Sequence, residues 1–228
     1  MSLNLTNVIN GLTRVSTKDI AYEQVKERII RLKLKPGSTI NRVSLEKEFG
    51  VSRTPMREAL QKLEGDGLVV QQANGTFKVS PVSKKEVREL FKIRSKLEGI
   101  LIEEAIDNLN QESIDHLTYL TDIIKVTSKL KSQDETEDYG YRFHAEIYRL
   151  SGNDTALILL EQLNDRINRY RNLAHNNKLG IESSSHEHEV ILKLMIEKNK
   201  EKAVEVLEQH IMDAQNSVVQ SLDNFDTH

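Results

Sequence analysis

One short segment carries polar side chains at a spacing suited to nucleic-acid recognition. If residues 53–64 form a helix, one sector of its surface presents Arg53, Thr54, Arg57 and Gln61. The neighbouring sector is apolar and would face a core: Met56, Ala59, Leu60 and Leu63. Guanidinium groups one helical turn apart could donate to phosphates and to guanine edges in a major groove. The alternative interpretation is a solvated helix whose arginines merely pair with Glu58.

A second set of residues, in the later part of the chain, could bind a metal ion. Helical periodicity places His144, His188 and His210 on inward or boundary faces of three different helices. Imidazoles that converge in a helical bundle are good ligands for zinc or nickel. His186 cannot join His188 from a regular helix, because residues two positions apart point about 200° apart. Each histidine taken alone could also be an ordinary semi-buried or surface residue.

The first part of the chain must hold residues 53–64 as an exposed helix. We expect a helix from Lys18 that stops by Lys35, further helices over residues 44–49 and 53–64, and strands over residues 68–71 and 76–79. Ser44 and Ser52 are the expected helix caps. Asn74-Gly75 predicts a type I′ hairpin turn, which needs positive φ at both central residues. This order predicts a winged helix-turn-helix over residues 18–80, preceded by a loose arm over residues 1–17.

From Pro81 onward the pattern predicts helices and hardly any strand. Ser83 to Glu86 has the pattern of a capping box, and it opens a long amphipathic helix that ends near Leu109. Five more helices are expected over residues 112–131, 136–150, 155–175, 184–198 and 200–223. The predicted fold is therefore mainly α, an N-terminal winged helix-turn-helix followed by an all-α antiparallel helical bundle over residues 81–228.

Composition and charge agree with this division. The chain of 228 residues is 38% hydrophobic and 29% charged, which is ordinary globular usage. It contains no cysteine, so disulfides and Cys-ligated metal sites are excluded. No apolar run approaches the ~20 residues of a membrane span, and the start lacks secretory features, so we expect a soluble cytoplasmic protein. Up to Ser80 there are 13 Lys and Arg against 8 Asp and Glu, while the remainder holds 19 against 27. Phosphate attracts the first part and repels the second.

A more specific pattern than periodicity surrounds the 53–64 segment. It runs Gly50-Val51-Ser52-Arg53-Thr54-Pro55-Met56-Arg57-Glu58-Ala59-Leu60, with Leu63-Glu64 and Gly67-Leu68-Val69 after it and Leu34-Lys35-Pro36-Gly37 before it. This pattern resembles the GntR family of bacterial transcription regulators, and the resemblance covers about residues 18–80. It implies that Arg53, Thr54 and Arg57 are recognition-helix contacts and that Gly75 lies at the wing tip near the minor groove. Arg42 and Glu46 depart from the usual family pattern.

The second part carries a more scattered resemblance. Its pieces are Arg94-Ser95-Lys96-Leu97-Glu98, Phe143-His144, Ser151-Gly152-Asn153, His188-Glu189-Val190-Ile191 and Ala203 through His210-Ile211. Together they resemble the FCD ligand-binding domain of the FadR branch of these regulators, in its six-helix VanR-like form. The resemblance implies a divalent metal such as zinc or nickel on His144, His188 and His210, and a small organic acid whose carboxylate is bound by Arg94.

One position departs from this second family pattern. The family has an aspartate ligand one turn before the first histidine, whereas Gly140 stands four residues before His144. Glu137 shares the face of His144 but lies about 10 Å away along a helix. The site therefore has three matching ligands and lacks the fourth, so metal binding with an added water, weak binding and a metal-free pocket all remain open.

These observations favour a homodimeric transcription regulator, which we expect to be a repressor, on a pseudo-palindromic operator in double-stranded DNA. A small carboxylate effector would control its operator affinity. Alternative signals are the metal ion itself or an acyl-CoA-type effector. A metal-dependent hydrolase, with Glu187 or Glu189 as base, is a remote alternative because no nucleophile motif or phosphate loop is present. We therefore expect no enzymatic activity.

Overall fold

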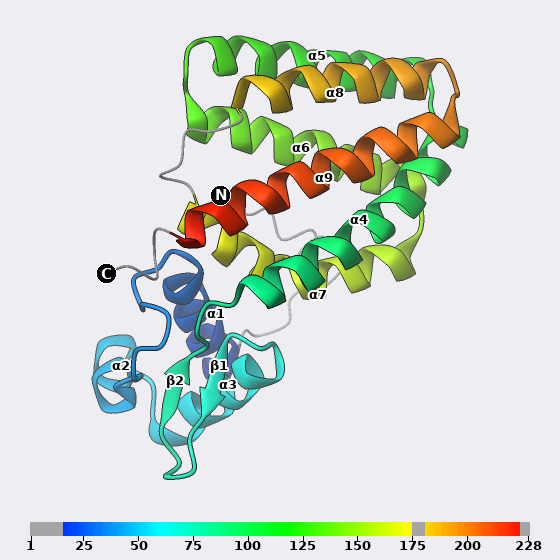
Figure 1. The fold of residues 1–228 in the computed structure, drawn as a ribbon. Coiled ribbons are helices and arrows are strands. Elements are labelled where there is room, and N and C mark those ends of the chain that lie inside the picture. Colours follow the sequence, from blue (N-terminus) through cyan, green and yellow to red (C-terminus); the bar gives the residue numbers. More distant parts are fainter. Residues whose placement is uncertain (1–15, 175–180, 224–228) are drawn as a thin grey trace. The chain divides into compact units, whose positions relative to one another are not determined.

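The chain divides into two compact units, Met1–Pro81 and Val82–His228, in a computed structural model that describes residues 16–174 and 181–223. The first unit contains α1 (Thr17–Ile30), α2 (Arg42–Phe49), α3 (Arg53–Gly65), β1 (Val69–Gln71) and β2 (Phe77–Val79). Figure 1 draws these elements in blue to cyan. Of the expected N-terminal arm, all but the last two residues lie outside the described part of the chain.

The core of the first unit lies between α1 and α3, which pack against each other. Both helices contribute side chains that are fully buried, among them Ala21, Val25, Ile29, Met56, Leu60 and Leu63. The apolar sector that the sequence assigned to α3 is thus confirmed as its buried face. Burial of this sector fixes the rotation of α3 and leaves the opposite face to solvent.

The wing is an antiparallel pair in which Val69 lies opposite Val79 and Gln71 opposite Phe77. Each strand begins one residue later than predicted. The prediction of a type I′ turn at Asn74-Gly75 is wrong. Gly75 N–H donates to Gln72 O, Gln72 N–H donates to Thr76 O, and only Gly75 takes positive φ in this turn, at 79°. This is a three-residue loop that ends in a left-handed glycine.

Two predicted helix caps also differ from the structure. Helix α2 begins at Arg42, and Asn41 rather than Ser44 is its cap, since the Asn41 side chain accepts a hydrogen bond from Ser44 N–H. Ser52 does occupy the cap position of α3, but its side chain makes no capping hydrogen bond. Both asparagine and serine are good caps, so the sequence alone did not distinguish positions three residues apart.

The second unit contains six helices within the described residues, as the sequence predicted. They are α4 (Lys84–Asp107), α5 (Gln111–Lys129), α6 (Gln133–Ser151), α7 (Asp154–Ala174), α8 (Ile181–Ile196) and α9 (Lys200–Asp223). Helix α4 packs against α6, α7 and α9, while α5 lies beside α6 and α8 (Figure 1). None of the described helices is long and apolar enough to cross a membrane.

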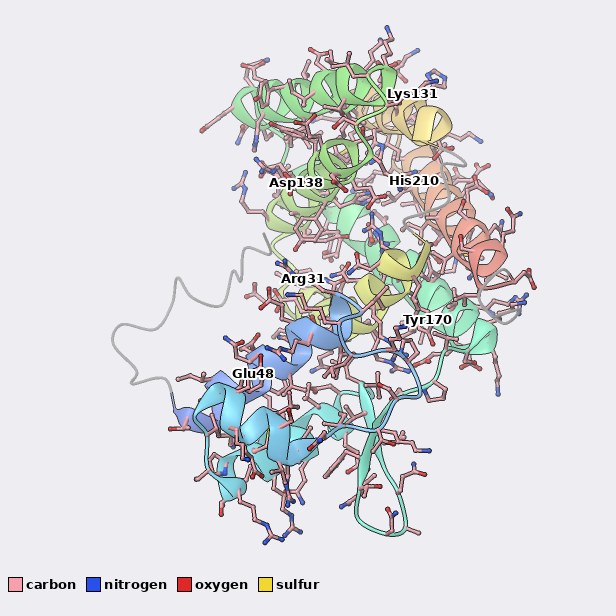
Figure 2. All side chains as sticks on the ribbon, turned by 90° about the vertical axis from the view of Figure 1, so that its left-hand side faces the viewer. Arg31, Glu48, Lys131, Asp138, Tyr170 and His210 are labelled. Carbon is pink, nitrogen blue, oxygen red and sulfur yellow. The ribbon has the colours of Figure 1, made fainter. Side chains whose placement is uncertain are left out.

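The start of α4 is fixed by contacts that the sequence only half predicted. Ser83 caps the helix by accepting from Glu86 N–H, but the side chain of Glu86 does not complete a capping box. It binds Arg166 and the hydroxyl of Tyr170 on α7 instead. Tyr170, labelled in Figure 2, also accepts a hydrogen bond from Ser83 N–H. The first turn of α4 is therefore tied to the C-terminal half of α7.

Candidate DNA interface and metal site

The predicted DNA contacts lie on the solvent face of α3. Arg53, Thr54, Arg57 and Gln61 are all exposed. In the described part of the chain neither arginine forms an ion pair, so pairing of Arg57 with Glu58 is not observed. Gly75 is exposed at the tip of the wing. Both arginines are therefore available to an external anion.

The second unit brings the three predicted metal ligands together. His144 from α6, His188 from α8 and His210 from α9 are buried, and one ring nitrogen from each lies within 4.8 Å of the others. The ring centroids are 4.7 to 5.4 Å apart. Figure 2 labels His210 on α9. We call these three side chains the histidine cluster.

Two rings of the histidine cluster hydrogen-bond through Nδ1 to carboxylates. Nδ1 of His144 lies 2.7 Å from Glu98 Oε2, and Nδ1 of His210 lies 2.6 Å from Glu187 Oε2. An ionised carboxylate only accepts hydrogen bonds, so each Nδ1 carries a proton, and in the neutral imidazole Nε2 then presents a lone pair. Carboxylates in this position orient and strengthen histidine ligands of metals.

The two Nε2 atoms then face each other in a way that suits a cation. Nε2 of His144 lies 3.3 Å from Nε2 of His210. Two lone pairs at this distance repel each other unless a proton or a metal ion lies between them. Nitrogens bound at ~2.0–2.1 Å to a tetrahedral ion would be about 3.3 Å apart. The spacing of this pair therefore suits a zinc-like ion, and the nitrogen of His188 lies within 4.8 Å of both.

Glu98 connects the histidine cluster to the predicted effector anchor. Arg94, one turn before Glu98 on α4, donates from Nε to Glu98 Oε1 over 2.5 Å. Tyr148 on α6 lies close enough to influence the ionisation of both side chains. Burial opposes ionisation of Glu98, but Arg94 and His144 outweigh it and hold the pKa of Glu98 well below its usual range. Arg94 donates to Glu98 through Nε, and its other guanidinium nitrogens can still donate hydrogen bonds to the carboxylate of a bound acid.

A second arginine lies within electrostatic reach of the same site. Arg171 on α7 interacts with Arg94, Glu137, Tyr148 and Glu98. Burial and the like charge of Arg94 lower the pKa of Arg171. Arg171 therefore adds a second positive charge near Arg94, and the carboxylates of Glu137 and Glu98 offset part of the repulsion between the two cations.

The two glutamates considered as a hydrolase base are bound to other side chains. Glu187 binds His210, and Glu189 forms an ion pair with Lys125 at 2.6 Å. His186 is exposed and points to Glu189, while His188 is buried, as expected for residues two apart on a helix. Neither glutamate is thus poised as a general base.

Several residues of this site escaped the sequence reasoning. Glu98 stands four residues after Arg94, a spacing that favours an ion pair on a helix, and this signal could have identified it. Glu187 was considered only as a possible hydrolase base, and no local pattern indicated its hydrogen bond to His210 on another helix. Tyr148 and Arg171 likewise become part of the site only through the packing of α4, α6 and α7.

The fold and site define a class of protein: a winged helix-turn-helix unit for DNA joined to a helical unit with a buried polar cluster. The sequence matches the description "Bacterial regulatory proteins, gntR family" over residues 17–79 and the FCD domain over residues 89–213. The chain belongs to the GntR family of bacterial transcription regulators and carries an FCD domain, as the sequence patterns indicated.

Similar proteins agree with this assignment. An uncharacterized HTH-type transcriptional regulator, YdhC of Bacillus subtilis strain 168, is 35% identical over 196 residues, 84% of each chain. A gluconate operon transcriptional repressor of Bacillus licheniformis is 25% identical over 222 residues, 95% of this chain and 91% of its own. The solved structure of E. coli McbR/YncC has the same fold, with a TM-score of 0.73 and 22% identity over 91% of this chain and 99% of that one. The protein is a transcription regulator and not an enzyme, and the hydrolase alternative is rejected.

Proposed function

We propose that the protein is a homodimeric repressor whose operator affinity falls when a small carboxylate binds in its FCD domain. Repression is supported by the relatives that carry the name of repressors. Two α3 helices of a dimer would enter successive major grooves of a pseudo-palindromic operator. Arg53, Thr54, Arg57 and Gln61 would make the contacts there, and Gly75 would bring the wing tip close to the backbone. This function belongs in the cytoplasm.

The effector proposal is supported mainly by the contacts of Glu98, which joins Arg94 to the histidine cluster. Its two oxygens bind Arg94 on one side and His144 on the other. An anion held by Arg94 would therefore lie next to the histidine cluster. Burial excludes competing water and strengthens both interactions.

His144, His188 and His210 would hold the divalent metal, with zinc or nickel as the ions that suit imidazole donors. When bound, the ion would supply a positive centre that attracts a carboxylate. Glu98 and Glu187 would keep the rings in the ligating tautomer. Arg94 would bind the acid through its remaining guanidinium nitrogens, and Arg171 would add a second positive charge.

Effector binding would act on DNA by changing populations. An acid that binds better to one arrangement of the protein stabilises that arrangement in proportion to its differential affinity. If the stabilised arrangement cannot place both α3 helices on the operator, DNA is released. Because binding free energies are reciprocal, operator DNA would weaken acid binding by the same factor.

The test begins with an operator selected from random double-stranded DNA by the full-length protein. Operator affinity is then measured by fluorescence anisotropy with chelator-stripped protein, with Zn²⁺, with acid and with both. The acids are glycolate, malate and gluconate, the last because of the name of one relative. We expect at least a tenfold loss of affinity with one acid plus Zn²⁺.

The matched control is Arg94→Lys, which keeps the charge but loses the planar fork that grips a carboxylate. It should bind the operator normally and lose the response to acid. A response to Zn²⁺ alone would favour the metal-responsive alternative. If operator affinity is the same with acid, with metal, with both and with neither, the proposed regulation by a carboxylate effector is wrong.

A further inference from the structure

Asn74 and Gly75, at the tip of the wing, are residue types that can react with each other. The peptide nitrogen that follows an asparagine can attack Cγ of its side chain, which closes a cyclic imide and releases ammonia. Glycine is the least hindered residue in the following position, because it has no side chain. Both residues are exposed, and a Cβ at Gly75 would meet no atom within 4 Å in the described structure. Solvent therefore reaches both partners of this reaction.

Thr76 donates two hydrogen bonds to the side-chain carbonyl of Asn74. Its backbone N–H lies 3.1 Å from Asn74 Oδ1, and its hydroxyl oxygen lies 2.7 Å from the same atom. The bond from the backbone N–H makes an Asx turn. The closed ring of this turn contains both Cγ of Asn74 and the peptide nitrogen of Gly75. The side chain is thus folded back towards the nitrogen that attacks it.

The same two donors suit the transition state of the attack. When the Gly75 nitrogen adds to Cγ, negative charge develops on Asn74 Oδ1. Donors that already point at an oxygen that gains charge lower the barrier, as they do in the oxyanion holes of enzymes. Hydrogen bonds to a charged acceptor are also stronger than those to a neutral one. Thr76 therefore favours the reaction of its neighbours.

One hydrogen bond opposes the reaction and makes it depend on the state of the wing. Gly75 N–H donates to Gln72 O over 2.8 Å, and the nitrogen has to lose this proton before it attacks. The loop joins strands of three residues each, and short hairpins are only marginally stable. Such a tip opens locally at little cost, and the contacts between Asn74 and Thr76 are local enough to persist. A partner that holds the tip closed slows the reaction.

We propose that Asn74 is a site of spontaneous deamidation, assisted by Thr76, that lowers the DNA affinity of the protein. The bond from Gly75 N to Asn74 Cγ forms as the bond from Cγ to Nδ2 breaks, and Nδ2 leaves as ammonia with the peptide proton. Water then opens the imide at one of its two carbonyls, which yields aspartate or isoaspartate. The net change is amide and water to carboxylic acid and ammonia, without an oxidant or reductant.

The consequence for DNA rests on the proposed function, in which Gly75 brings the wing tip close to the operator backbone. A carboxylate at Asn74 is repelled by the phosphates there. Isoaspartate also lengthens the backbone of the loop by one methylene group. Because ammonia is lost, the amide does not form again, and operator affinity declines with the age of each molecule.

The chemistry is tested on the full-length protein without DNA. The protein is incubated in mildly alkaline buffer, and peptide mapping by mass spectrometry follows each asparagine separately. We expect Asn74 to react at least tenfold faster than Asn216. The latter precedes Ser217 within α9, where helical hydrogen bonds hold the following peptide nitrogen away from the side chain. Equal rates at the two asparagines would overturn the proposal.

The role of Thr76 is tested with two variants in the same assay. Thr76→Val keeps the shape but removes the hydroxyl, and it should slow the reaction of Asn74 at least threefold. Thr76→Ser keeps the hydroxyl and should react at nearly the wild-type rate. If both variants react like the wild type, Thr76 does not assist the attack and that part of the proposal is wrong.

The effect on DNA is tested with Asn74→Asp, which supplies the carboxylate directly. We expect it to weaken operator binding at least fivefold at low salt and less at high salt, because salt screens the repulsion. Asn74→Ser removes the amide without adding charge, and Asn216→Asp adds the same charge to α9; both should stay within twofold of the wild type. Equal weakening by Asp and Ser at position 74 would show that charge is not the cause.

Failure of the proposed function would look different from failure of this inference. Deamidation rates are measured without DNA, so they stand even if the wing does not touch an operator. If the wing does lie on the operator, saturating operator DNA should slow the reaction of wild-type Asn74 at least threefold. A fast reaction that operator DNA does not slow, together with normal affinity in Asn74→Asp, would overturn the assigned effect on DNA affinity.

Discussion

Helix α3, which we propose as the recognition helix, and the histidine cluster hold their side chains in opposite ways. Arg53 and Arg57 are exposed, and in the described structure they form no ion pairs. His144 and His210 are buried, and each is held by a carboxylate from another helix. On α3 the fold fixes only the backbone and leaves these side chains in solvent. In the cluster the fold fixes the side chains themselves.

This difference teaches what a substitution can report in each region. An exposed arginine can be removed without leaving a buried charge behind, so its loss reports on the partner alone. Removing a member of the buried network leaves other buried groups without their counterparts, and the folded state itself is destabilised. Affinity measurements suffice for α3, whereas every variant of the cluster needs a stability measurement beside it.

The largest expected effect comes from Glu98→Ala. Glu98 is fully buried and is the counterion of buried Arg94 as well as the partner of His144. Breaking a buried ion pair on one side costs about 3–5 kcal/mol of the free energy of unfolding. Urea unfolding of the full chain, followed by circular dichroism and by hydrogen exchange of α4 peptides, measures this loss.

The control for that substitution is Glu103→Ala, which removes an exposed glutamate from the same helix. It should change the free energy of unfolding by less than about 0.5 kcal/mol. If Glu98→Ala were equally mild, Arg94 would have to find another counterion, and the contrast between the two regions would disappear.

Arg57→Ala should have the opposite profile. We expect it to weaken operator binding by about 1–3 kcal/mol, the usual loss for a base or phosphate contact, and to leave the free energy of unfolding nearly unchanged. Arg31→Ala removes an equal charge from an exposed site at the end of α1 and serves as control. Undiminished operator affinity in Arg57→Ala, or an equal loss in Arg31→Ala, would show that α3 does not recognise DNA through this residue.

Glu187→Gln probes the less buried side of the cluster. The change removes the carboxylate that orients His210, and loss of such a partner costs 10- to 100-fold in metal affinity. We expect about tenfold, because Glu187 keeps 24% of its side chain exposed. Competition with a chromophoric zinc chelator measures the change. Glu189→Gln, on the same helix but paired with Lys125, should leave metal affinity unaltered.

The two regions also differ in how far the sequence predicts them. The exposed face of α3 follows from the periodicity of one helix, since burial of its apolar sector determines where the other residues point. The three histidines could be chosen because the periodicity places each on an inward or boundary face of its own helix. Their pairing with Glu98 and Glu187 could not be predicted, because it depends on the relative register of helices far apart in the chain.

Local errors in the prediction have local physical causes. Asn41 and Ser44 are both suitable caps for α2. The Asn41 side chain accepts a hydrogen bond from Ser44 N–H, so Asn41 is the cap and Ser44 lies within the first turn. In the wing, the bond from Gln72 N–H to Thr76 O closes a three-residue loop, so Asn74 is not at a position of positive φ. Energy differences near 1 kcal/mol decide such alternatives, and residue preferences alone do not resolve them.

The smallest expected effect concerns two exposed glycines of the first unit. At these positions the backbone conformation, and not a side-chain contact, determines how a substitution changes stability. Gly75 and Gly65 are both exposed, and a Cβ at either would meet no atom within 4 Å in the described structure. Gly75 has a φ of 79°, whereas Gly65 is the last residue of α3 and has no positive φ. Gly75→Ala should therefore destabilise the first unit by about 1 kcal/mol, since a side chain disfavours the left-handed conformation. Gly65→Ala should stabilise it by about 0.4–1 kcal/mol, since alanine loses less backbone freedom in a helix. Hydrogen exchange of peptides from α1 and α3 gives the sign of both changes, and equal signs would refute the assignment of Gly75 to a left-handed wing tip.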